Sequence, residues 1–451
     1  MTTTAVQRLT SVEDAKRIIL EHATPLGAEH VPLRDAVGRV LAQDLVATAS
    51  LPPFDNSAMD GYAVRSGDTL TAASEQPVIL QVVGEVAAGH VGDRVLGSGE
   101  AVKIMTGAPV PPGADSVVML EEARLRSDGH QGRAEWPIPC GPGIPSPPRW
   151  RRLHRTRGAS GRGERVEIFR PVAPGSHVRR AGEDIKAGET ALKAGAAIRV
   201  QHLGLLAGLG CGVVAVSRRP SVAIVATGSE LVGIDQPLSP GKIRNSNSLV
   251  LEALLRQLGI EPADVGTVVD ERDLIRRRLE EAARCDVMLI SGGVSVGAHD
   301  LVKRVLTELG METLFWRVNM KPGKPLLAGR LQGKMVFGLP GNPISCVVGF
   351  LVFIAPFLRK AMGAQDFDEG VVRAQLTQPL CKKEPKTQFF TARLREDEGA
   401  LVVTPTPQQG SGMLTSLAQA NAFIVVPDQT MELAAGAVVD VLPLWGEECL
   451  R

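Results

Sequence analysis

Three short loops of glycine and small polar residues stand in the second half of the sequence, each directly after an apolar run. They are VATGSE at 225–230, SGGVSVG at 291–297 and GLPGNP at 338–343. Backbone N–H groups in such loops bind anions, because the N-terminus of the following helix adds partial positive charge. Each loop alone is equally typical of an ordinary turn, since Asn342 can cap a helix that Pro343 begins. The loops therefore indicate an anion site only together with other residues.

A turn with two lysines lies between the second and third loops, in the sequence Lys321-Pro322-Gly323-Lys324-Pro325. The two prolines stiffen the backbone that carries the two ammonium groups, as an oxyanion site requires. A solvated surface turn is the alternative interpretation, because lysine side chains are mostly exposed.

Five carboxylates stand in motifs or at turns: Asp60, Asp184, Glu230, Asp270 and Asp300. Each could be only a turn or cap residue, and Asp300 would complement the dipole of a helix that begins there. Several carboxylates around a phosphate-bearing ligand would repel it by ~4 kcal/mol per pair of unit charges, at about 4 Å and an effective dielectric near 20. A divalent cation must then lie between them, and Mg²⁺ suits oxygen ligands and phosphates.

Strand and helix patterns alternate in the same half of the chain. Short β-rich runs cover 221–226, 265–269, 287–290 and 335–339, and helical patterns cover 250–258, 271–283, 300–309 and 344–358. This alternation predicts an open, parallel, doubly wound α/β domain, in which ligands bind at the carboxyl ends of the strands. The run at 344–358 contains Pro356 and is shorter than the roughly twenty residues that cross a bilayer, so it predicts a buried helix.

The flanking segments predict three further parts. A helix is expected after Ser11 and another over 198–209, whereas turn residues and short apolar runs predict mostly β structure from Leu51 to about Arg126 and again from about Asp366. The predicted domains are 1–50 with 172–215 (helix-rich N-terminal and linker), 51–171 (β-rich, with an irregular insertion at 132–165), 216–363 (α/β) and 364–451 (small, β-barrel-like). The basic insertion is interpreted as a solvated loop rather than a nucleic-acid patch.

Composition narrows the classes of function. The formal net charge of +1 argues against a broad electrostatic grip on nucleic acid or an anionic membrane. The six cysteines are scattered without metal-binding spacing, which predicts reduced thiols and no zinc site. The first fifteen residues lack the apolar core of a signal peptide, so a cytoplasmic protein is expected.

The motifs together resemble one family. PPFDNSAMDGYAV, IMTGAPVPPGAD, VRRAGEDI, VATGSEL, GKIRNSNS, SGGVSVG followed by Asp300, MKPGKP and GLPGNPIS occur in the order typical of the molybdopterin molybdenumtransferases, the MoeA and gephyrin E-domain family. The resemblance covers nearly the whole chain apart from 132–165, and the pair DNSAMDGYA and SGGVSVG is highly specific.

The resemblance implies an enzyme of molybdenum cofactor biosynthesis that inserts molybdate into adenylated molybdopterin and releases AMP. It implies a homodimer, with Asp60 of one subunit acting at the α/β domain of the other. Asp60, Thr106, Glu230, Asp270 and Asp300 are expected to be catalytic, and Asp60, Glu230 and Asp300 to bind Mg²⁺. The expected substrate-binding residues are Asp184, Thr227, Gly228, Ser229, Ser291, Gly292, Gly293, Ser295, Gly297, Lys321, Lys324, Pro340, Gly341, Asn342 and Ser411. The expected protein partners are the molybdopterin adenylyltransferase and apo-molybdoenzymes or their chaperones.

Two departures from the family pattern stand out. Thr391 occupies a position where relatives often carry arginine, which leaves Lys386 and Arg393 as the nearby cations. The insertion at 132–165 is longer than the usual connection, although long surface loops cost little closure entropy. Two alternatives remain: a molybdopterin adenylyltransferase, which the α/β domain alone resembles, and a binding or scaffold protein without chemistry.

Overall fold

The computed structural model describes residues 9–126, 163–294, 301–368 and 370–444. The chain forms two compact units. Unit 1 comprises Met1–Asp44, Lys193–Leu203 and Gly212–Arg451, and unit 2 comprises Leu45–Leu192 and Gly204–Cys211. The four-domain division expected from the sequence stays a prediction.

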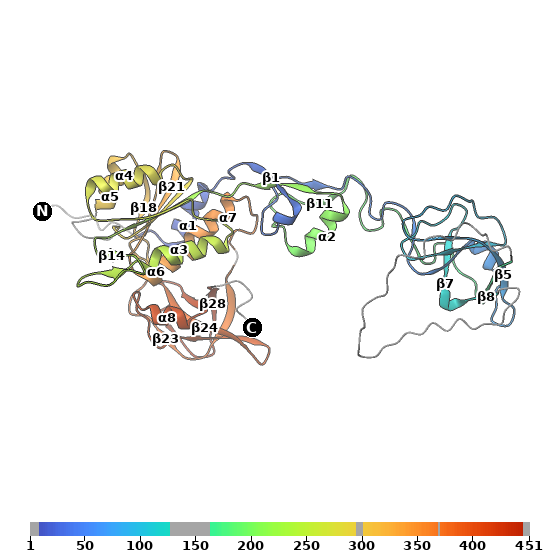
Figure 1. Cartoon of the computed structure of the whole chain (residues 1–451). Coiled ribbons are helices and arrows are strands. Elements are labelled where there is room, and N and C mark those ends of the chain that lie inside the picture. The colour runs from blue at the N-terminus through green and yellow to red at the C-terminus, as the bar shows by residue number, and fades with distance from the viewer. Residues whose placement is uncertain (1–8, 127–162, 295–300, 369, 445–451) are drawn as a thin grey trace. The chain divides into compact units, whose positions relative to one another are not determined.

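A six-stranded sheet is the centre of unit 1 (Figure 1). Its strand order is β16-β13-β17-β21-β20-β18. The strands are β13 (Val222–Thr227), β16 (Asp264–Val268), β17 (Val287–Ser291), β18 (Glu312–Trp316), β20 (Leu327–Leu331) and β21 (Lys334–Leu339). The helices between them are α3 (Ser246–Gln257), α4 (Arg272–Ala282) and α5 (Leu301–Glu308). A short pair, β14 (Leu231–Val232) with β15 (Ile243–Arg244), precedes α3.

The expectation of an all-parallel sheet was wrong at one edge. β16, β13, β17 and β21 are parallel, but β20 runs antiparallel to β21 and β18 antiparallel to β20. Gln332 and Gly333, which join β20 to β21, have φ of 51° and 80°. Two consecutive left-handed residues form the tight turn that connects antiparallel neighbours, so no crossover helix is present there.

Both faces of the sheet are buried. Along β13, Val222 and Ile224 belong to the core cluster shared with α3, whereas Ala223 and Val225 belong to the one shared with α4 and α5. Side chains alternate between the faces of a strand, so an apolar run without polar interruption is covered on both sides. Figure 1 shows α4 and α5 on one face of the sheet and α3 with α6 on the other.

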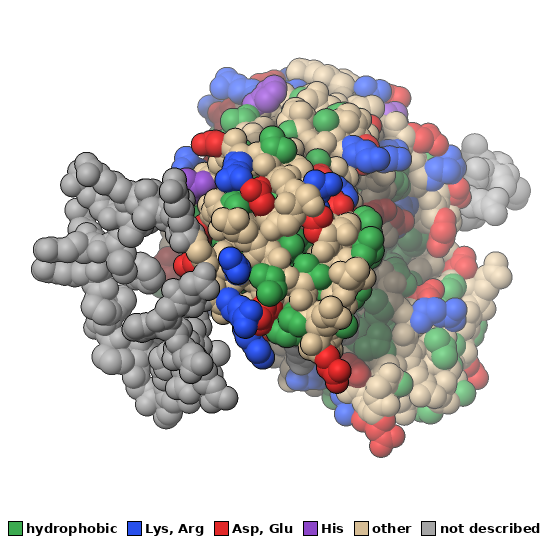
Figure 2. All heavy atoms as spheres, turned by 90° about the vertical axis from the view of Figure 1, so that its right-hand side faces the viewer, with side chains coloured by type: hydrophobic (Ala, Val, Ile, Leu, Met, Phe, Trp, Pro, Cys, Tyr) green, Lys and Arg blue, Asp and Glu red, His purple; other side chains and the backbone are tan. Residues whose placement is uncertain are grey.

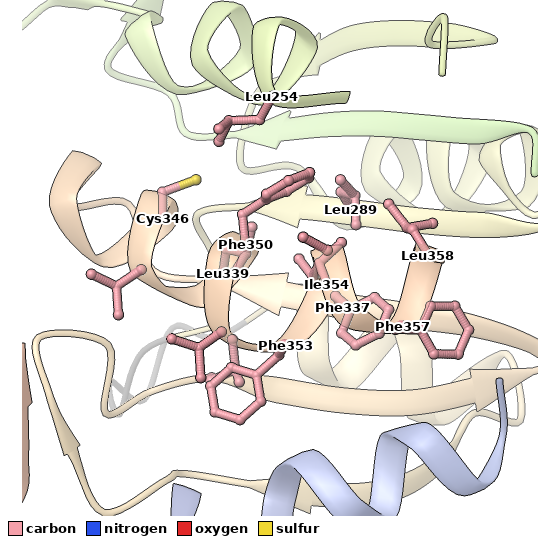
Figure 3. Close-up of a cluster of buried hydrophobic side chains, with 14 of the residues drawn as sticks. Leu254, Leu289, Phe337, Leu339, Cys346, Phe350, Phe353, Ile354, Phe357 and Leu358 are labelled. Carbon is pink, nitrogen blue, oxygen red and sulfur yellow. The ribbon is translucent and has the colours of Figure 1, made fainter. Parts of the chain in front are cut away.

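The apolar run after β21 is one continuous helical segment, as predicted. It consists of α6 (Pro343–Gly349), a π-helical turn η4 (Phe350–Ile354) and α7 (Ala355–Ala361), so Pro356 does not end it. The segment is long and apolar enough to cross a membrane, but 83% of its apolar stretch is buried inside the protein. In Figure 3 Phe350 lies on the side of Leu254 and Leu289, and Phe353 lies on the opposite side. It is a core helix.

The N-terminal part of unit 1 packs on this core. The predicted first helix is α1 (Val12–Glu21), and the Ser11 hydroxyl accepts a hydrogen bond of 3.0 Å from the Asp14 N–H, as a helix cap does. After it β1 (Ala28–Pro32) pairs antiparallel with β12 (Val213–Ser217), followed by η1 (Leu33–Asp35). The helix expected over 198–209 is α2 (Val200–Gly208), of which the first four residues belong to unit 1 and the rest to unit 2.

A closed five-stranded barrel ends unit 1, as the sequence predicted for a small C-terminal β part. Its strands are β22 (Val372–Leu376), β24 (Thr387–Asp397), β25 (Ala400–Pro405), β26 (Ala422–Val426) and β28 (Val438–Pro443), and the pairing of β24 with β26 closes it. A pair of short strands, β23 (Leu380–Cys381) and β27 (Glu432–Leu433), and helix α8 (Leu414–Gln419) accompany it. The barrel also pairs with β19 (Met320–Lys321) through β24.

Unit 2 is mostly β structure, as predicted. Its main sheet has the order β7-β4-β6-β5-β9-β8. The strands are β4 (Gly61–Val64), β5 (Val78–Val86), β6 (Glu100–Ile104), β7 (Ser116–Met119), β8 (Ala123–Arg126) and β9 (Arg165–Ile168), with 3-10 turns η2 (Ser66–Thr69) and η3 (Leu120–Glu122). Short pairs join β3 (Asn56–Ser57) to β10 (Val178–Arg179) and β2 (Leu45–Val46) to β11 (Thr190–Leu192). The predicted loop at 132–165 lies outside the described residues up to 162, and its last residue already begins β9.

Basic and acidic side chains are interspersed on the face drawn in Figure 2. On the described part of that face no broad area carries a single sign of charge, as the near-neutral composition predicts. Any anionic ligand bound there would need a local site.

Candidate active site

Three of the predicted loops meet at one edge of the central sheet. β13, β17 and β21 are adjacent and parallel, so their carboxyl ends deliver 227–230, 291–294 and 339–342 side by side. Ser291 stands in register with Ala226 on one side and Leu339 on the other. The Gly292 N–H donates to the Leu339 carbonyl at 3.0 Å, which ties the second loop to the third. This edge is where α/β folds bind ligands.

The second loop admits only glycine where it passes the first. Gly292 has φ of +93°, and a Cβ there would lie 2.4 Å from the Thr227 carbonyl oxygen. At Gly293 a Cβ would lie 2.7 Å from the Thr227 hydroxyl oxygen and 2.3 Å from a Val302 methyl. Backbone atoms, rather than side chains, therefore pass the end of β13 at close range.

Two buried polar side chains, Asn247 and Thr227, lie at the same edge, and they differ in their hydrogen bonds. Asn247 of α3 donates to the Ser291 hydroxyl at 2.9 Å and to the Gly341 carbonyl at 2.8 Å, which links two loops. Thr227 is 3% exposed, and its hydroxyl oxygen has no hydrogen-bond partner among the residues that the structure describes. A buried hydroxyl without a partner is costly unless a ligand satisfies it.

Two of the predicted carboxylates belong to this edge. The Ser229 N–H donates to Asp270 Oδ2 and the Asp270 N–H donates to Ser229 Oγ, both at 3.0 Å. Both residues are exposed, as is Glu230 next to them, whose carboxylate lies against Gly228. Ser295, Gly297 and Asp300 lie outside the described residues, so their predicted roles stay predictions.

The donor set at this edge fits Mg²⁺. Glu230 and Asp270 offer exposed carboxylate oxygens, and the unpartnered Thr227 hydroxyl lies in the cradle that a Cβ on Gly293 would fill. Magnesium prefers such oxygens together with water and phosphate. Within the described ranges no three His, Cys, Asp or Glu side chains cluster as a complete metal site, so the protein part of the set found here is partial.

The lysine turn lines a separate cavity of about 290 Å³ in unit 1. Pairing of β19 with β24 holds Lys321 in register with Gln388 of the barrel. Asn342 donates to the Ser411 hydroxyl at 3.1 Å, and both line the cavity together with Lys324 and Pro340. The structure thus brings together five of the predicted substrate-binding residues: Lys321, Lys324, Pro340, Asn342 and Ser411.

Sequence reasoning missed Glu384 at this cavity and named its neighbour Lys386 only as a cation near Thr391. Glu384 accepts from Lys321 Nζ at 3.3 Å and pairs with Lys386, and both Glu384 and Lys386 line the cavity. Hydrogen bonds from Lys386 and then from Lys321 hold the pKa of Glu384 below its usual value. Thr391 also lines it, with its hydroxyl 2.6 Å from that of Thr406, whereas Arg393 is not among the lining residues.

A larger cavity of about 680 Å³ lies elsewhere in unit 1. Its walls come from α1, the π-helical turn, α7 and the barrel, with apolar residues such as Leu20, Val352 and Phe389. None of the site residues expected from the sequence lines it. Size alone therefore does not mark the chemical site, and the smaller cavity carries the lysines.

In unit 2, Asp60 is held by Thr106. The N–H and the hydroxyl of Thr106 donate to Asp60 Oδ1 at 2.7 Å and 2.8 Å. These two hydrogen bonds, the backbone one first, lower the pKa of Asp60. One carboxylate oxygen is therefore fixed, and the carboxylate stays ionised for use as a ligand or a base.

Three motifs of unit 2, DNSAMDGYA, IMTGAPVPPGAD and VRRAGEDI, meet around Asp55. Sequence reasoning did not single out this residue. Asp55 accepts from Arg180 at 2.6 Å and from the Ala181 N–H at 2.8 Å, and its carbonyl accepts from the Val110 N–H. Asp184 follows on the surface, and its N–H donates to the Leu51 carbonyl. The only signal for Asp55 was its place in DNSAMDGYA, because its partner Arg180 lies 125 residues away.

The fold and the site define an α/β ligand-binding protein with accessory β parts. Three family models match: the MoeA N-terminal region (domain I and II) over 10–210, a probable molybdopterin binding domain over 223–360, and the MoeA C-terminal region (domain IV) over 373–444. Molybdopterin molybdenumtransferases of Bacillus subtilis and Staphylococcus aureus are 34% and 32% identical over 96% of this chain and 93% and 94% of theirs.

The structure agrees with these sequence matches. A molybdopterin biosynthesis MoeA protein from Pyrococcus horikoshii superposes with a TM-score of 0.78 at 31% identity, covering 97% of this chain and all of that one. The chain belongs to the molybdopterin molybdenumtransferase family, the transferases of molybdenum cofactor biosynthesis, which confirms the expectation from the motifs. The adenylyltransferase alternative, which rested on the α/β part alone, is not favoured.

Proposed function

We propose that this chain inserts molybdate into adenylated molybdopterin, with Mg²⁺ bound and with release of AMP. The observation that carries the proposal is the meeting of three strand-end loops at one edge of the central sheet of unit 1, which also holds the lysine-lined cavity. The loops at the sheet edge suit phosphates, and the lysine-lined cavity suits a small oxyanion. The two are connected, because the third loop supplies Pro340 and Asn342 to the cavity.

The residues of the sheet edge would bind the pyrophosphate and adenylate. The Gly292-Gly293 turn lets backbone atoms come close, and the Thr227 hydroxyl would donate to a phosphate oxygen. Glu230 and Asp270, with the expected Asp300, would hold Mg²⁺. Such an ion would supply positive charge to offset the negative charge of the phosphoanhydride during its cleavage.

The residues of the cavity would hold molybdate. The Lys321 and Lys324 ammonium groups neutralise its charge, and Asn342 and Ser411 offer hydrogen bonds to its oxygens. Holding two reactants in fixed geometry removes much of the entropic part of the barrier. No covalent protein nucleophile is required.

Turnover of purified protein with adenylated molybdopterin, Mg²⁺ and molybdate tests the proposal. We expect AMP and completed cofactor in equal amounts, and loss of both when Mg²⁺ is chelated. Neither product forming under these conditions would contradict the proposal, and binding of the pterin without turnover would identify a silent binding protein instead.

The proposal includes a homodimer in which Asp60 of one subunit serves the sheet edge of the other. A complementation experiment tests this point: Asp60→Asn and Glu230→Gln, each inactive alone, are unfolded together and refolded as a mixture. Random pairing of two equal variants gives heterodimers with one intact site, so we expect about a quarter of wild-type turnover. Recovery of no activity would show that both residues serve the same subunit.

In the cell, the chain would receive adenylated molybdopterin from the molybdopterin adenylyltransferase and pass the finished cofactor to apo-molybdoenzymes or their chaperones, in the cytoplasm. The support for this part is chemical, because each step must take the labile product of the one before.

A further inference from the structure

Among the described residues, four charged side chains line the lysine cavity: Lys321, Lys324, Lys386 and Glu384. Three ammonium groups and one carboxylate leave two positive charges in excess. Glu384 bridges two of the lysines, since one carboxylate oxygen lies 3.3 Å from Lys321 Nζ and the other pairs with Lys386 Nζ. The protein's own Glu384 carboxylate thus lies between Lys321 and Lys386, where an oxyanion would bind.

The segment that carries Lys386 and Glu384 is fixed to the lysine turn. Lys382 is 7% exposed, and its ammonium group donates to the Lys386 carbonyl at 2.7 Å and to the carbonyls of Pro427 and Asp428. Asn319, just before β19, accepts from the Thr387 N–H at 3.1 Å and donates to the Pro385 carbonyl. The backbone of Lys386 is therefore held in place, while the Glu384 side chain is 43% exposed and can turn outward.

The other described residues that line the cavity, Thr391 among them, are uncharged. Thr391 is 2% exposed, its hydroxyl lies 2.6 Å from that of Thr406, and its N–H donates to Gln409 at 3.0 Å. Gln409 in turn donates to the carbonyls of Thr391 and Thr406, so these groups are satisfied among themselves. The barrel's cationic contribution to the cavity lining is Lys386.

We propose that Lys386 is the third cation of the oxyanion site, and that Glu384 occupies the site in the free protein and is displaced when a tetrahedral dianion binds between Lys321 and Lys386. This inference rests on the proposed function, since molybdate is the oxyanion concerned. After displacement the three ammonium groups meet a dianion, and Glu384 sets the affinity by competing for two of them. Lys386 and Glu384 are specificity-determining residues in this scheme.

Titration of the full chain with molybdate by calorimetry tests the inference directly. Removing a charge-assisted hydrogen bond costs a factor of about 10 or more in affinity, so Lys386→Met should weaken molybdate binding by that much and Lys386→Arg should retain most of it. Glu384→Gln should tighten binding by roughly threefold to tenfold, because the competing charge is gone. The matched control is Lys383→Met, since Lys383 is exposed and outside the cavity lining.

The outcomes separate the inference from the proposed function. Unchanged affinity in Lys386→Met, or equal or weaker binding in Glu384→Gln, would overturn the inference while turnover of the wild type stands. Failure of the wild type to bind molybdate while still forming cofactor would also overturn it, because the oxyanion would then bind elsewhere. Failure of both binding and turnover would overturn the proposed function itself. Unfolding midpoints of all variants are measured in parallel, and Lys386→Arg keeps the test open if Lys386→Met does not fold.

Discussion

The two ends of β13 carry the same small motif and use it differently. At the amino end Ser221 and Asp286 exchange hydrogen bonds of 2.8 Å and 2.9 Å between backbone N–H groups and side-chain oxygens. At the carboxyl end Ser229 and Asp270 exchange the same two bonds at 3.0 Å. One strand therefore has a reciprocal serine–aspartate pair beyond each of its ends, and each pair ties β13 to a neighbouring strand.

The amino-end pair is completed by further partners. Arg218 donates to both oxygens of Asp286, at 2.9 Å and 3.2 Å, and the Ser221 hydroxyl adds a bond of 2.7 Å. Burial raises the pKa of Asp286, but the hydrogen bonds from Arg218 and Ser221 outweigh it and lower the pKa to about 2. A carboxylate satisfied in this way stabilises the fold.

The carboxyl-end pair is left incomplete. Asp270 is exposed, and among the described residues no lysine or arginine pairs with it. Glu230 adds a second carboxylate next to it, and the nearby Thr227 hydroxyl has no hydrogen-bond partner within the described part of the chain. The same hydrogen-bond geometry therefore stabilises the fold at the amino end, where the charge of the aspartate is balanced. At the carboxyl end that charge is not balanced, and the pair is available for a ligand.

The largest loss of turnover should come from a change in the Gly292-Gly293 turn, which passes the carboxyl end of β13. In Gly292→Ala the new methyl would lie 2.4 Å from the Thr227 carbonyl oxygen at a φ of +93°, so the loop must move. We expect turnover to fall by about 100-fold or more, because misplacing bound groups by ~1 Å costs that much. AMP release measures it, at a temperature where circular dichroism shows the variant folded. Gly212→Ala, which has open space around its Cβ, is the control and should remain active.

Neutralising the two aspartates should separate activity from stability. Asp270→Asn keeps an acceptor for the Ser229 N–H, so its free energy of unfolding should change by less than about 1 kcal/mol while turnover falls about 100-fold. Asp286→Asn leaves Arg218 without its partner and should cost roughly 2 kcal/mol in unfolding free energy with turnover within about threefold of wild type. Urea unfolding and AMP release measure the two quantities. Equal loss of stability in the two variants would show that Asp270 stabilises the fold as Asp286 does.

The stability contribution of Asp286 should vanish in acid. Its pKa is about 2 in the folded protein and 3.8 in its ordinary state, so the contribution is present above about pH 4 and is lost as the pH falls toward 2. The difference in unfolding free energy between wild type and Asp286→Asn should shrink from roughly 2 kcal/mol at neutral pH to near zero at about pH 2. Denaturant unfolding across this range measures it, and a constant difference would contradict the assignment.

The smallest changes are expected from removing two hydroxyl groups, that of Ser221 just before β13 and that of Thr227 at its end. Ser221→Ala removes hydrogen bonds to and from Asp286 and should cost about 1 kcal/mol in unfolding free energy. Thr227→Val keeps the shape and removes a hydroxyl without a partner, so stability should stay equal or rise slightly, while affinity for adenylated molybdopterin falls. Thermal unfolding and binding titration measure the pair. A clear loss of stability in Thr227→Val would show a partner within the protein.

Much of the fold could be predicted because its signals are local. The apolar runs ending at Thr227, Ser291 and Leu339 have the length and composition of buried strands, and the helices between them show their own period. The antiparallel edge was missed, because the turn at Gln332-Gly333 carries little sequence signal and its hairpin falls between two stronger motifs. The buried helix over 344–358 was predicted with Pro356 inside it, and a π-helical turn precedes that proline.

The sequence by itself determined the family, the order of the strand and helix units and the glycine loops, since these depend on residues close together along the chain. Only the tertiary structure decided which charges meet: Lys321 with Glu384 across 63 residues, and Arg218 with Asp286 across 68. Electrostatic and hydrogen-bond energies depend on distance in space and on burial, and neither can be measured along a sequence. Two serine–aspartate pairs with the same reciprocal hydrogen bonds are therefore a stabilising contact in one case and a candidate ligand site in the other.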